Sequence, residues 1–219
     1  MQCLKDRGLS IVLFILFAAF IVGHAIAGYR ADNQQRREHG ESPGTLPEYL
    51  TGGEFAESVF ENWESEFLQM GMYVLLTSWL IQRGSAESKD PDRRSEQDTD
   101  PRRHRDDRRA PWPVRRGGVS LALYEYSLAI AFGLLFALSF ALHAVGGARA
   151  YSQERLEHGE GPIGTLAYLG TSRFWFESFQ NWQSEFLAVL SIVLLSIVLR
   201  QRGSPQSKPV HAPHSQTGD

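Results

Sequence analysis

The sequence predicts an all-α membrane protein with four transmembrane helices, arranged as two tandemly repeated hairpins with short interfacial helices in the outer loops. Three observations support this fold class. The chain repeats itself at an offset of 119 residues, its apolar residues gather in four blocks, and its basic residues concentrate outside the two hairpin loops. Because self-similarity at a fixed period indicates repeated structural units, the chain is interpreted as two copies joined by a connector.

The repeat is visible in several motifs. Glu38-His39-Gly40-Glu41 returns as Glu157-His158-Gly159-Glu160, and Gln82-Arg83-Gly84-Ser85 returns as Gln201-Arg202-Gly203-Ser204. The run FENWESEFL from Phe60 returns with few changes as FQNWQSEFL from Phe179. We therefore expect a first transmembrane hairpin repeat at residues 1–84, a flexible charged cytoplasmic linker at 85–117, a second hairpin repeat at 118–204 and a disordered tail at 205–219.

The four apolar blocks are the expected membrane helices, namely Leu9 to Ala27, Phe67 to Ile81, Leu121 to Val145 and Phe186 to Leu199. A spanning helix needs about 20 mostly apolar residues, which the first and third blocks provide alone. The second and fourth reach that length only if their helices start near Phe60 and Phe179. In the outer loops, Thr45 followed by Glu48 is a capping-box pattern, and Thr165 is its counterpart, so a short helix is expected in each copy.

The first apolar block has an alternative interpretation. Lys5 and Arg7, the apolar run and Ala25-Ile26-Ala27 together imitate a secretory signal with a cleavage site. The equivalent segment of the second copy, which contains His143, lies in mid-chain where a signal peptide does not occur. Retention as a membrane helix is therefore favoured.

Charge predicts the orientation in the membrane. Sixteen of the 22 lysines and arginines lie in the N-terminal segment, in the central segment from Arg83 to Arg116 and in the C-terminal segment from Arg200 on, and the two hairpin loops hold the other six. Since basic flanking segments stay in the cytoplasm, both termini and the linker are expected there, with both Glu-His-Gly loops outside. Interleaved acids in the linker weigh against nucleic-acid binding and favour a solvated connector.

Polar residues within the helices form a candidate site, with two structural alternatives left open. From the rise per residue, His24 and Glu66 lie about 22 and 25 Å from the cytoplasmic helix ends, so they could pair near the outer face. Paired histidine and glutamate are what a proton relay or a metal site uses. Alternatively, the asparagine caps its helix and the glutamate interacts with the helix dipole. The candidate residues of the two copies are His24, Asn62 and Glu66, and His143, Asn181 and Glu185.

Other chemical signals are weak. His39 and His158, each followed by glycine, are interpreted first as turn residues and only second as ligands. No recognised catalytic signature is present, and Cys3, the only cysteine, excludes an internal disulfide. The sequence identifies no cofactor.

The repeated motifs, together with Ala110-Pro111-Trp112-Pro113-Val114-Arg115-Arg116-Gly117-Gly118, resemble a family of bacterial membrane proteins described as a domain of unknown function. The resemblance covers nearly the whole chain and implies a multi-pass protein of the bacterial inner membrane. It supplies no activity, substrate or catalytic residue. The favoured function is a non-enzymatic envelope or scaffold component, ahead of a small-ion or proton conduit through the His/Glu pairs and of a metal or redox enzyme. The lipid bilayer is the expected partner, and a protein partner or homo-oligomer is left open.

Overall fold

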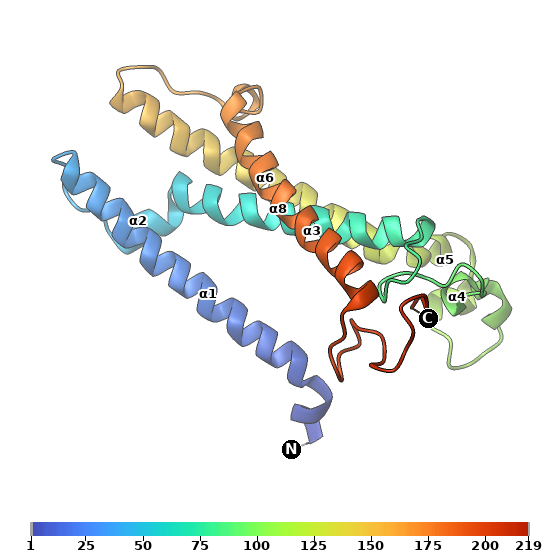
Figure 1. Ribbon diagram of the computed structural model, residues 1–219. Helices are drawn as coiled ribbons and strands as arrows, with labels where there is room; N and C mark the ends of the chain where they lie inside the picture. The colour runs from blue at the N-terminus through green and yellow to red at the C-terminus, as the bar shows by residue number, and fades with distance from the viewer. Residues whose placement is uncertain (1, 219) are drawn as a thin grey trace. The chain divides into compact units, whose positions relative to one another are not determined.

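The computed structural model describes residues 2–218, and within that range it is all-helical, with no strand. Long helices dominate the ribbon in Figure 1. They are α1 (Gln2–Glu38), α3 (Gly53–Trp79), α6 (Ser127–Glu157) and α8 (Ser172–Val198). The shorter elements are α2 (Leu46–Thr51), α4 (Trp112–Arg116), α5 (Gly118–Glu125) and α7 (Thr165–Tyr168), with 3₁₀ turns η1 (Glu96–Asp98) and η2 (Pro101–His104).

Three of the described helices are long and apolar enough to cross a membrane, namely Asp6–Glu38 within α1, together with α6 and α8. Helix α3 has the same length as α8, 27 residues, but its first half is more acidic. Five glutamates lie there, at positions 54, 57, 61, 64 and 66. The span predicted in α3 therefore stays a prediction, whereas the other three agree in length and composition with the sequence pattern.

The helix boundaries refine the predictions. Helices α3 and α8 begin at Gly53 and Ser172, each seven residues before the expected start. The third apolar block is divided, because α5 ends at Glu125 and α6 begins at Ser127. The short helices α2 and α7 confirm the elements predicted in the outer loops. At α2 the capping box is present, since the side chains and backbones of Thr45 and Glu48 bond reciprocally.

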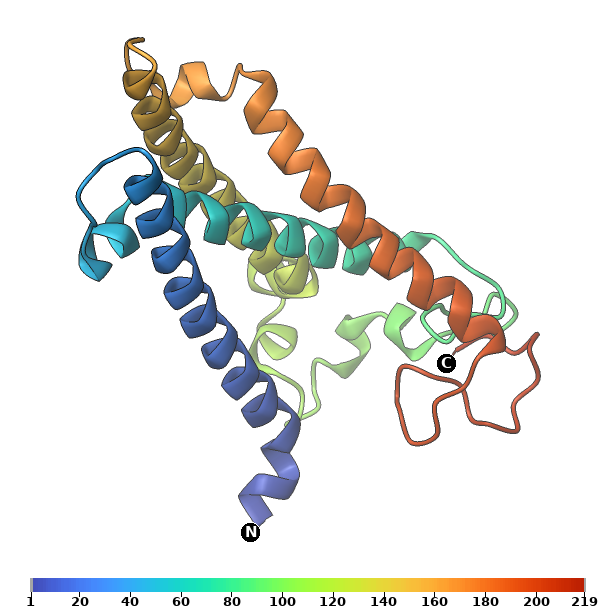
Figure 2. The ribbon, with the colours of Figure 1, turned by 60° about the vertical axis from the view of Figure 1, so that its left-hand side comes forward.

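The described chain divides into two compact units. The first contains the chain up to Phe60 together with Leu142–Phe174, and the second contains Glu61–Ala141 together with the chain from Trp175 on. Each unit therefore combines residues from both halves of the sequence. In the first unit α2 folds back beside the C-terminal part of α1, as Figures 1 and 2 both show.

Two glycines let α3 and α6 meet in the first unit. A Cβ on Gly53 would lie 2.5 Å from the backbone nitrogen of Ala150, and a Cβ on Gly146 would lie 2.6 Å from the backbone nitrogen of Glu57. Neither position has room for a side chain, so the two backbones pack directly. Small residues at such crossings are typical of helices that associate in membranes, where van der Waals packing replaces the hydrophobic effect.

The Glu-His-Gly-Glu motifs end α1 and α6 with the same geometry. Gly40 and Gly159 both have a φ of 77°, in the left-handed region that favours glycine. Glu41 and Glu160 each donate a backbone hydrogen bond of 2.8 Å to the carbonyl five residues earlier, and the two glycines donate to the carbonyl three residues earlier. These bonds form a Schellman motif, which satisfies carbonyls at the helix end. The turn interpretation of both motifs is confirmed.

The Gln-Arg-Gly-Ser motifs form matching turns after α3 and α8, within the second unit. Their glycines have φ values of 86° and 83°. The N–H of Gln82 donates to the Ser88 hydroxyl, and the N–H of Gln201 donates to the Ser207 hydroxyl, each at 2.9 Å. The correspondence thus extends three residues beyond the motif recognised in the sequence.

The tail contacts the first of these turns, also within the second unit. Lys208 is only 4% exposed, and its Nζ donates to four carbonyl oxygens, those of Gly84, Pro213, His214 and Gln216. Gly218 donates its N–H to the Ser85 carbonyl at 2.8 Å. Composition did not indicate these contacts. The disorder predicted for residues 205–219 and the flexibility predicted for 85–117 stay predictions.

Candidate functional site

The six polar residues singled out in the sequence are divided between the two units. His24 on α1 and His143 on α6 lie in the first unit. In the second unit, Asn62 and Glu66 on α3 are exposed, whereas Asn181 and Glu185 on α8 are half-buried. The expected pairs, His24 with Glu66 and His143 with Glu185, would join residues of different units and stay predictions.

His24 has a hydroxyl as its polar neighbour in the first unit. Its Nε2 lies 3.0 Å from Oγ of Ser58, and that hydroxyl donates to the Phe55 carbonyl at 3.1 Å. The ring of Phe55 meets His24 edge-on, with centroids 5.6 Å apart. The residue is thus hydrogen-bonded and packed.

Tyr49 completes this first cluster. Its hydroxyl lies over Gly28 of α1 so closely that a Cβ there would be 1.9 Å from it. The Tyr49 and Phe55 rings lie 5.5 Å apart. The side chain of Tyr49 therefore occupies the space that a side chain at residue 28 would need. This contact, which only glycine permits, holds α2 against α1.

A second cluster repeats this arrangement at positions 119 residues further on, still in the first unit. Tyr168 lies over Gly147, where a Cβ would be 2.5 Å from the ring, and its ring is 5.7 Å from Phe174. His143 stacks on Phe174 with centroids 4.8 Å apart. Tyr168, Phe174 and His143 are fully buried. The Tyr, Phe and Gly residues that recur 119 positions apart therefore pack alike in both clusters, whereas the histidine meets its phenylalanine edge-on in the first and stacked in the second.

The second cluster contains a carboxylate that the first lacks. The Tyr168 hydroxyl donates to Oε1 of Glu57 at 2.9 Å, and Glu57 is only 8% exposed. A carboxylate oxygen of Glu57 and a ring nitrogen of His143 lie within 4.8 Å of each other. The Tyr49 hydroxyl, by contrast, makes no hydrogen bond to another described residue. A carboxylate, an imidazole and a phenol thus meet in one buried place.

The second unit holds a separate buried carboxylate. Glu64 on α3 is 0% exposed, and the indole Nε1 of Trp182 on α8 donates to its Oε1 at 3.1 Å. The Trp182 ring packs against other aromatic rings at 5.5–6.4 Å, those of Phe136, Trp175 and Phe179. The indole that binds this carboxylate therefore lies in an aromatic cluster of the second unit.

Sequence reasoning missed Glu57, Glu64 and Tyr168. A usable signal was present, because Glu54, Glu57, Glu61 and Glu64 recur at intervals of three and four residues, which places them on one face of a helix. The second copy carries Arg173, Phe176, Gln180 and Gln183 at these positions. The acidic face is therefore specific to the first copy.

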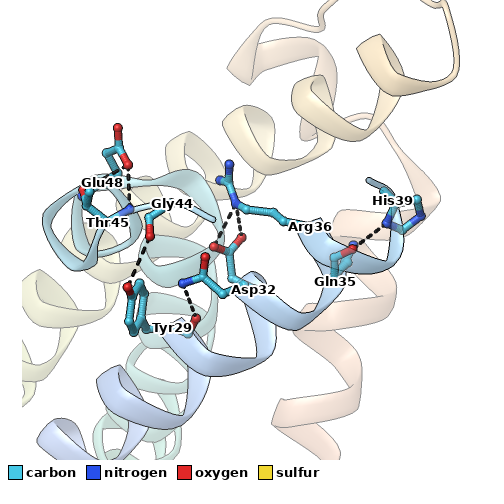
Figure 3. A network of polar contacts seen from close by, with 9 residues as sticks. Tyr29, Asp32, Gln35, Arg36, His39, Gly44, Thr45 and Glu48 are labelled. Atoms are coloured by element: carbon cyan, nitrogen blue, oxygen red, sulfur yellow. Dashed lines mark hydrogen bonds and ion pairs between the residues drawn. The ribbon is translucent and has the colours of Figure 1, made fainter. Parts of the chain in front are cut away.

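The histidines of the two Glu-His-Gly motifs, expected in the outer loops, lie at helix ends. Nδ1 of His39 donates to the Gln35 carbonyl and Nδ1 of His158 to the Glu154 carbonyl, each at 2.8 Å. Both side chains are exposed. Figure 3 shows His39 within a wider network of polar contacts at the end of α1. The outer-loop motif is thus a structural cap in both copies.

The same network continues into α2. Tyr29 donates to the Gly44 carbonyl at 3.2 Å, and Arg36 pairs with Asp32 at 3.0 Å (Figure 3). Hydrogen bonds from the Thr45 backbone and then from its hydroxyl hold the pKa of Glu48 below its usual range. These contacts connect the end of α1 to the start of α2. The charged side chains of Asp32, Arg36 and Glu48 all find partners within this region.

Comparison with protein families supplies one match. The family model described as a domain of unknown function (DUF6766) covers residues 1–219. The chain belongs to the DUF6766 family. Searches of the curated proteins and of the solved structures find no match. Membership agrees with the family of unknown function that the motifs resemble, and a DUF6766 assignment names no activity, so the functional argument rests on the geometry of this chain.

Proposed function

We propose that this DUF6766 protein is a non-enzymatic structural component of the bacterial inner membrane, built from two tandem hairpins with four spans and both termini in the cytoplasm. One observation carries the proposal. The duplicated residues form the same packing arrangement twice, with Gly28 seating Tyr49 and Gly147 seating Tyr168. The residues that the two copies share thus include those that fix these tyrosine–glycine contacts and the helix ends at Gly40 and Gly159.

The charged residues of the buried face are not shared. Glu57 corresponds to Phe176 and Glu64 corresponds to Gln183. A conduit lined by Glu57 and Glu64 would therefore have no equivalent groups in the second copy. The His/Glu pairs of the conduit alternative are present in both copies, so the flux measurement described below is what separates the two functions.

The surface of α1 supports a place in the membrane. Large apolar side chains project from it on several sides, and Leu9, Phe14 and Phe20 are each about 70% exposed or more. Such a surface is stable in lipid or against another protein. Helix α1 also has the length of a spanning helix.

The topology is tested by cysteine labelling in a Cys3→Ser background. Cysteines introduced at Ser42 and Gly161, in the two outer loops, should react with an impermeant thiol reagent applied to intact cells. A cysteine at Ser95 should react only after the cells are opened. Labelling at Ser95 in intact cells would refute the proposed orientation.

The scaffold function is tested against the conduit in proteoliposomes that contain a pH-sensitive dye. Proton flux through the wild-type protein should equal that of protein-free liposomes, and Glu66→Gln and Glu185→Gln should leave it there. In cells that lack the native copy, both variants should restore growth under envelope stress as well as the wild type does. Flux that either substitution abolishes would contradict the scaffold and support the conduit.

A further inference from the structure

A pocket lies in the first unit between the C-terminal part of α6 and the loop that connects α6 to α7. Its volume is about 590 Å³, within the range of about 300–1,000 Å³ that is usual for ligand pockets. The Ser152 hydroxyl accepts a hydrogen bond of 3.0 Å from the N–H of Ile163, which fixes the loop to the helix. The pocket is therefore a feature of the folded unit, bounded by a helix and a tethered loop.

Much of the pocket lining is apolar. Val145, Ala148 and Leu156 contribute to it from α6, and Ile163 contributes from the loop. Apolar side chains of this kind stabilise methylene groups that are removed from water. The pocket is thus suited to hydrocarbon over part of its surface.

The apolar space results from two differences between the copies. The counterparts of Ala148 and Ile163 are Tyr29 and Gly44. In the first copy the Tyr29 hydroxyl donates to the Gly44 carbonyl at 3.2 Å, so the phenol crosses from α1 to the loop. An alanine side chain does not reach that far, and in the second copy the space beside Ala148 belongs to the pocket.

Three polar side chains in the pocket lining offer hydrogen-bond donors that have no partner. They are the guanidinium of Arg149, the amide of Gln153 and the hydroxyl of Thr165. None of these side chains makes a hydrogen bond or ion pair with another residue that the structure describes. Because the guanidinium is a donor only and always carries its charge, the pocket calls for an acceptor, and for an anion above all.

The charge of Arg149 is not balanced by the acidic residues of the same region. No carboxylate is among the described residues that line the pocket. Glu160 pairs with Arg155 at 2.8 Å, and Glu154 pairs with Arg173. The pocket therefore has one uncompensated positive charge beside an apolar surface.

The position of Arg149 along α6 fits the boundary of a membrane. A helix of 31 residues is about 46 Å long, whereas the hydrocarbon core of a bilayer is about 30 Å thick. Arg149 lies eight residues before the end of α6 at Glu157, a distance of about 12 Å. In a helix centred on the bilayer, the guanidinium is then near the level of the lipid headgroups.

An anion that carries hydrocarbon chains satisfies both parts of the pocket. Arginine binds phosphate through paired, charge-assisted hydrogen bonds. We propose that the pocket binds one anionic phospholipid, with its phosphate on Arg149 and an acyl chain against Val145 and Ala148. A zwitterionic headgroup fits less well, because its ammonium meets no carboxylate in the pocket. The inference rests on the membrane location proposed above, and it does not depend on which side of the membrane each loop faces.

The test is native mass spectrometry of the full-length protein, delipidated in a non-ionic detergent and titrated with phosphatidylglycerol. The wild type should bind about one lipid per chain in a saturable manner, and phosphatidylcholine should bind more weakly. Arg149→Gln should weaken phosphatidylglycerol binding by about 10-fold or more, as loss of a charged donor does. Arg30→Gln, at the equivalent exposed position beside Tyr29, is the matched control and should bind as the wild type does. Inorganic phosphate, which has no acyl chain, should not compete.

A second variant fills the pocket and keeps the charge. Ala148→Tyr combined with Ile163→Gly reproduces the pair found in the first copy, and it should abolish binding although Arg149 is retained. Circular dichroism identifies variants that fail to fold, and the exposed Arg149→Gln substitution provides the test if the double variant does not fold.

Three results would overturn the lipid site. They are absence of phosphatidylglycerol from the wild type, undiminished binding by folded Arg149→Gln, and an equal loss of binding in Arg30→Gln. Displacement of the lipid by inorganic phosphate would assign the pocket to a small anion and would also overturn the proposal. Each of these results leaves the cysteine-labelling test of topology unaffected, so the lipid site and the proposed function fail separately.

Discussion

Replacing Tyr168 with phenylalanine tests the hydrogen bond that distinguishes the two aromatic clusters. The substitution removes one oxygen and keeps the ring, so the contacts with Gly147 and Phe174 remain. The Glu57 carboxylate then loses a 2.9 Å bond in a place where it is only 8% exposed. Tyr49→Phe is the matched control, because the Tyr49 hydroxyl donates to no described residue.

The expected loss follows from the burial of the acceptor. A buried polar group left without its partner costs about 1–3 kcal/mol, whereas hydrogen bonds within membrane bundles average about 0.6 kcal/mol because the unfolded state finds substitutes. Tyr168 is fully enclosed and Glu57 is nearly so, which favours the larger figure. Tyr49→Phe should cost less than about 0.5 kcal/mol, as substitutions away from such features do.

The assay is reversible thermal unfolding in detergent, with a chelator present so that no metal ion contributes. For a chain of 150–250 residues, a loss of about 1 kcal/mol lowers the Tm by about 2–4 °C. Tyr168→Phe should therefore lower the Tm by several degrees and Tyr49→Phe by less than about 2 °C. Equal Tm values for the two variants would show that the bond to Glu57 contributes nothing, and would refute the reasoning.

Three other predictions concern packing, the tail and a helix cap. Gly146→Ala should destabilise the protein by about 1–3 kcal/mol in the same thermal assay, because the added methyl group overpacks against α3. The control is Gly133→Ala, on the same helix with open space around it, which should be neutral or stabilising by up to about 1 kcal/mol. Lys208→Met should speed proteolysis of the tail at least 10-fold, since bonds from a charged donor contribute about 1.5–3 kcal/mol, and an unchanged rate would mean that the tail is held by other contacts. Because hydrogen bonds from Thr45 depress the folded-state pKa of Glu48, this cap stabilises α2 above the unfolded pKa of about 4.3 and is lost as the pH falls through the lower folded value. Amide exchange in α2, relative to intrinsic rates, should therefore rise in acid for the wild type and stay level in Glu48→Gln.

Local chemistry explains which parts of the fold were predictable. The turn at Gly40 and the capping box at Thr45 depend on residues within one helical turn, so their sequence patterns are sufficient. The starts of α3 and α8 were placed seven residues late because the residues before Phe60 and Phe179 mix polar and charged side chains with apolar ones. An apolar block marks the part of a helix that enters the membrane, and mixed helical turns before it do not extend that block.

The candidate site was harder to predict because its contacts are long-range. Glu57 and Tyr168 are 111 residues apart, and they meet only because α3 crosses α6 at Gly53 and Gly146. No periodicity in either helix indicates that crossing. His24 and His143 were recognised as equivalent residues, but their polar neighbours differ, since equivalent positions on two helices need not face equivalent surroundings.

Gly28, which contacts Tyr49, and Gly40, which ends α1, together fix the length of helix that lies between them. They stand twelve residues apart on α1, and Gly147 and Gly159 stand twelve apart on α6. Each residue of an α-helix turns the chain by about 100°. One residue inserted between Gly28 and Gly40 would therefore rotate the loop that leaves α1 to another side of the helix. Tyr49, at the end of that loop, would then no longer reach Gly28. Length variation in this protein should thus be tolerated before Gly28 or beyond Tyr49, and excluded between them.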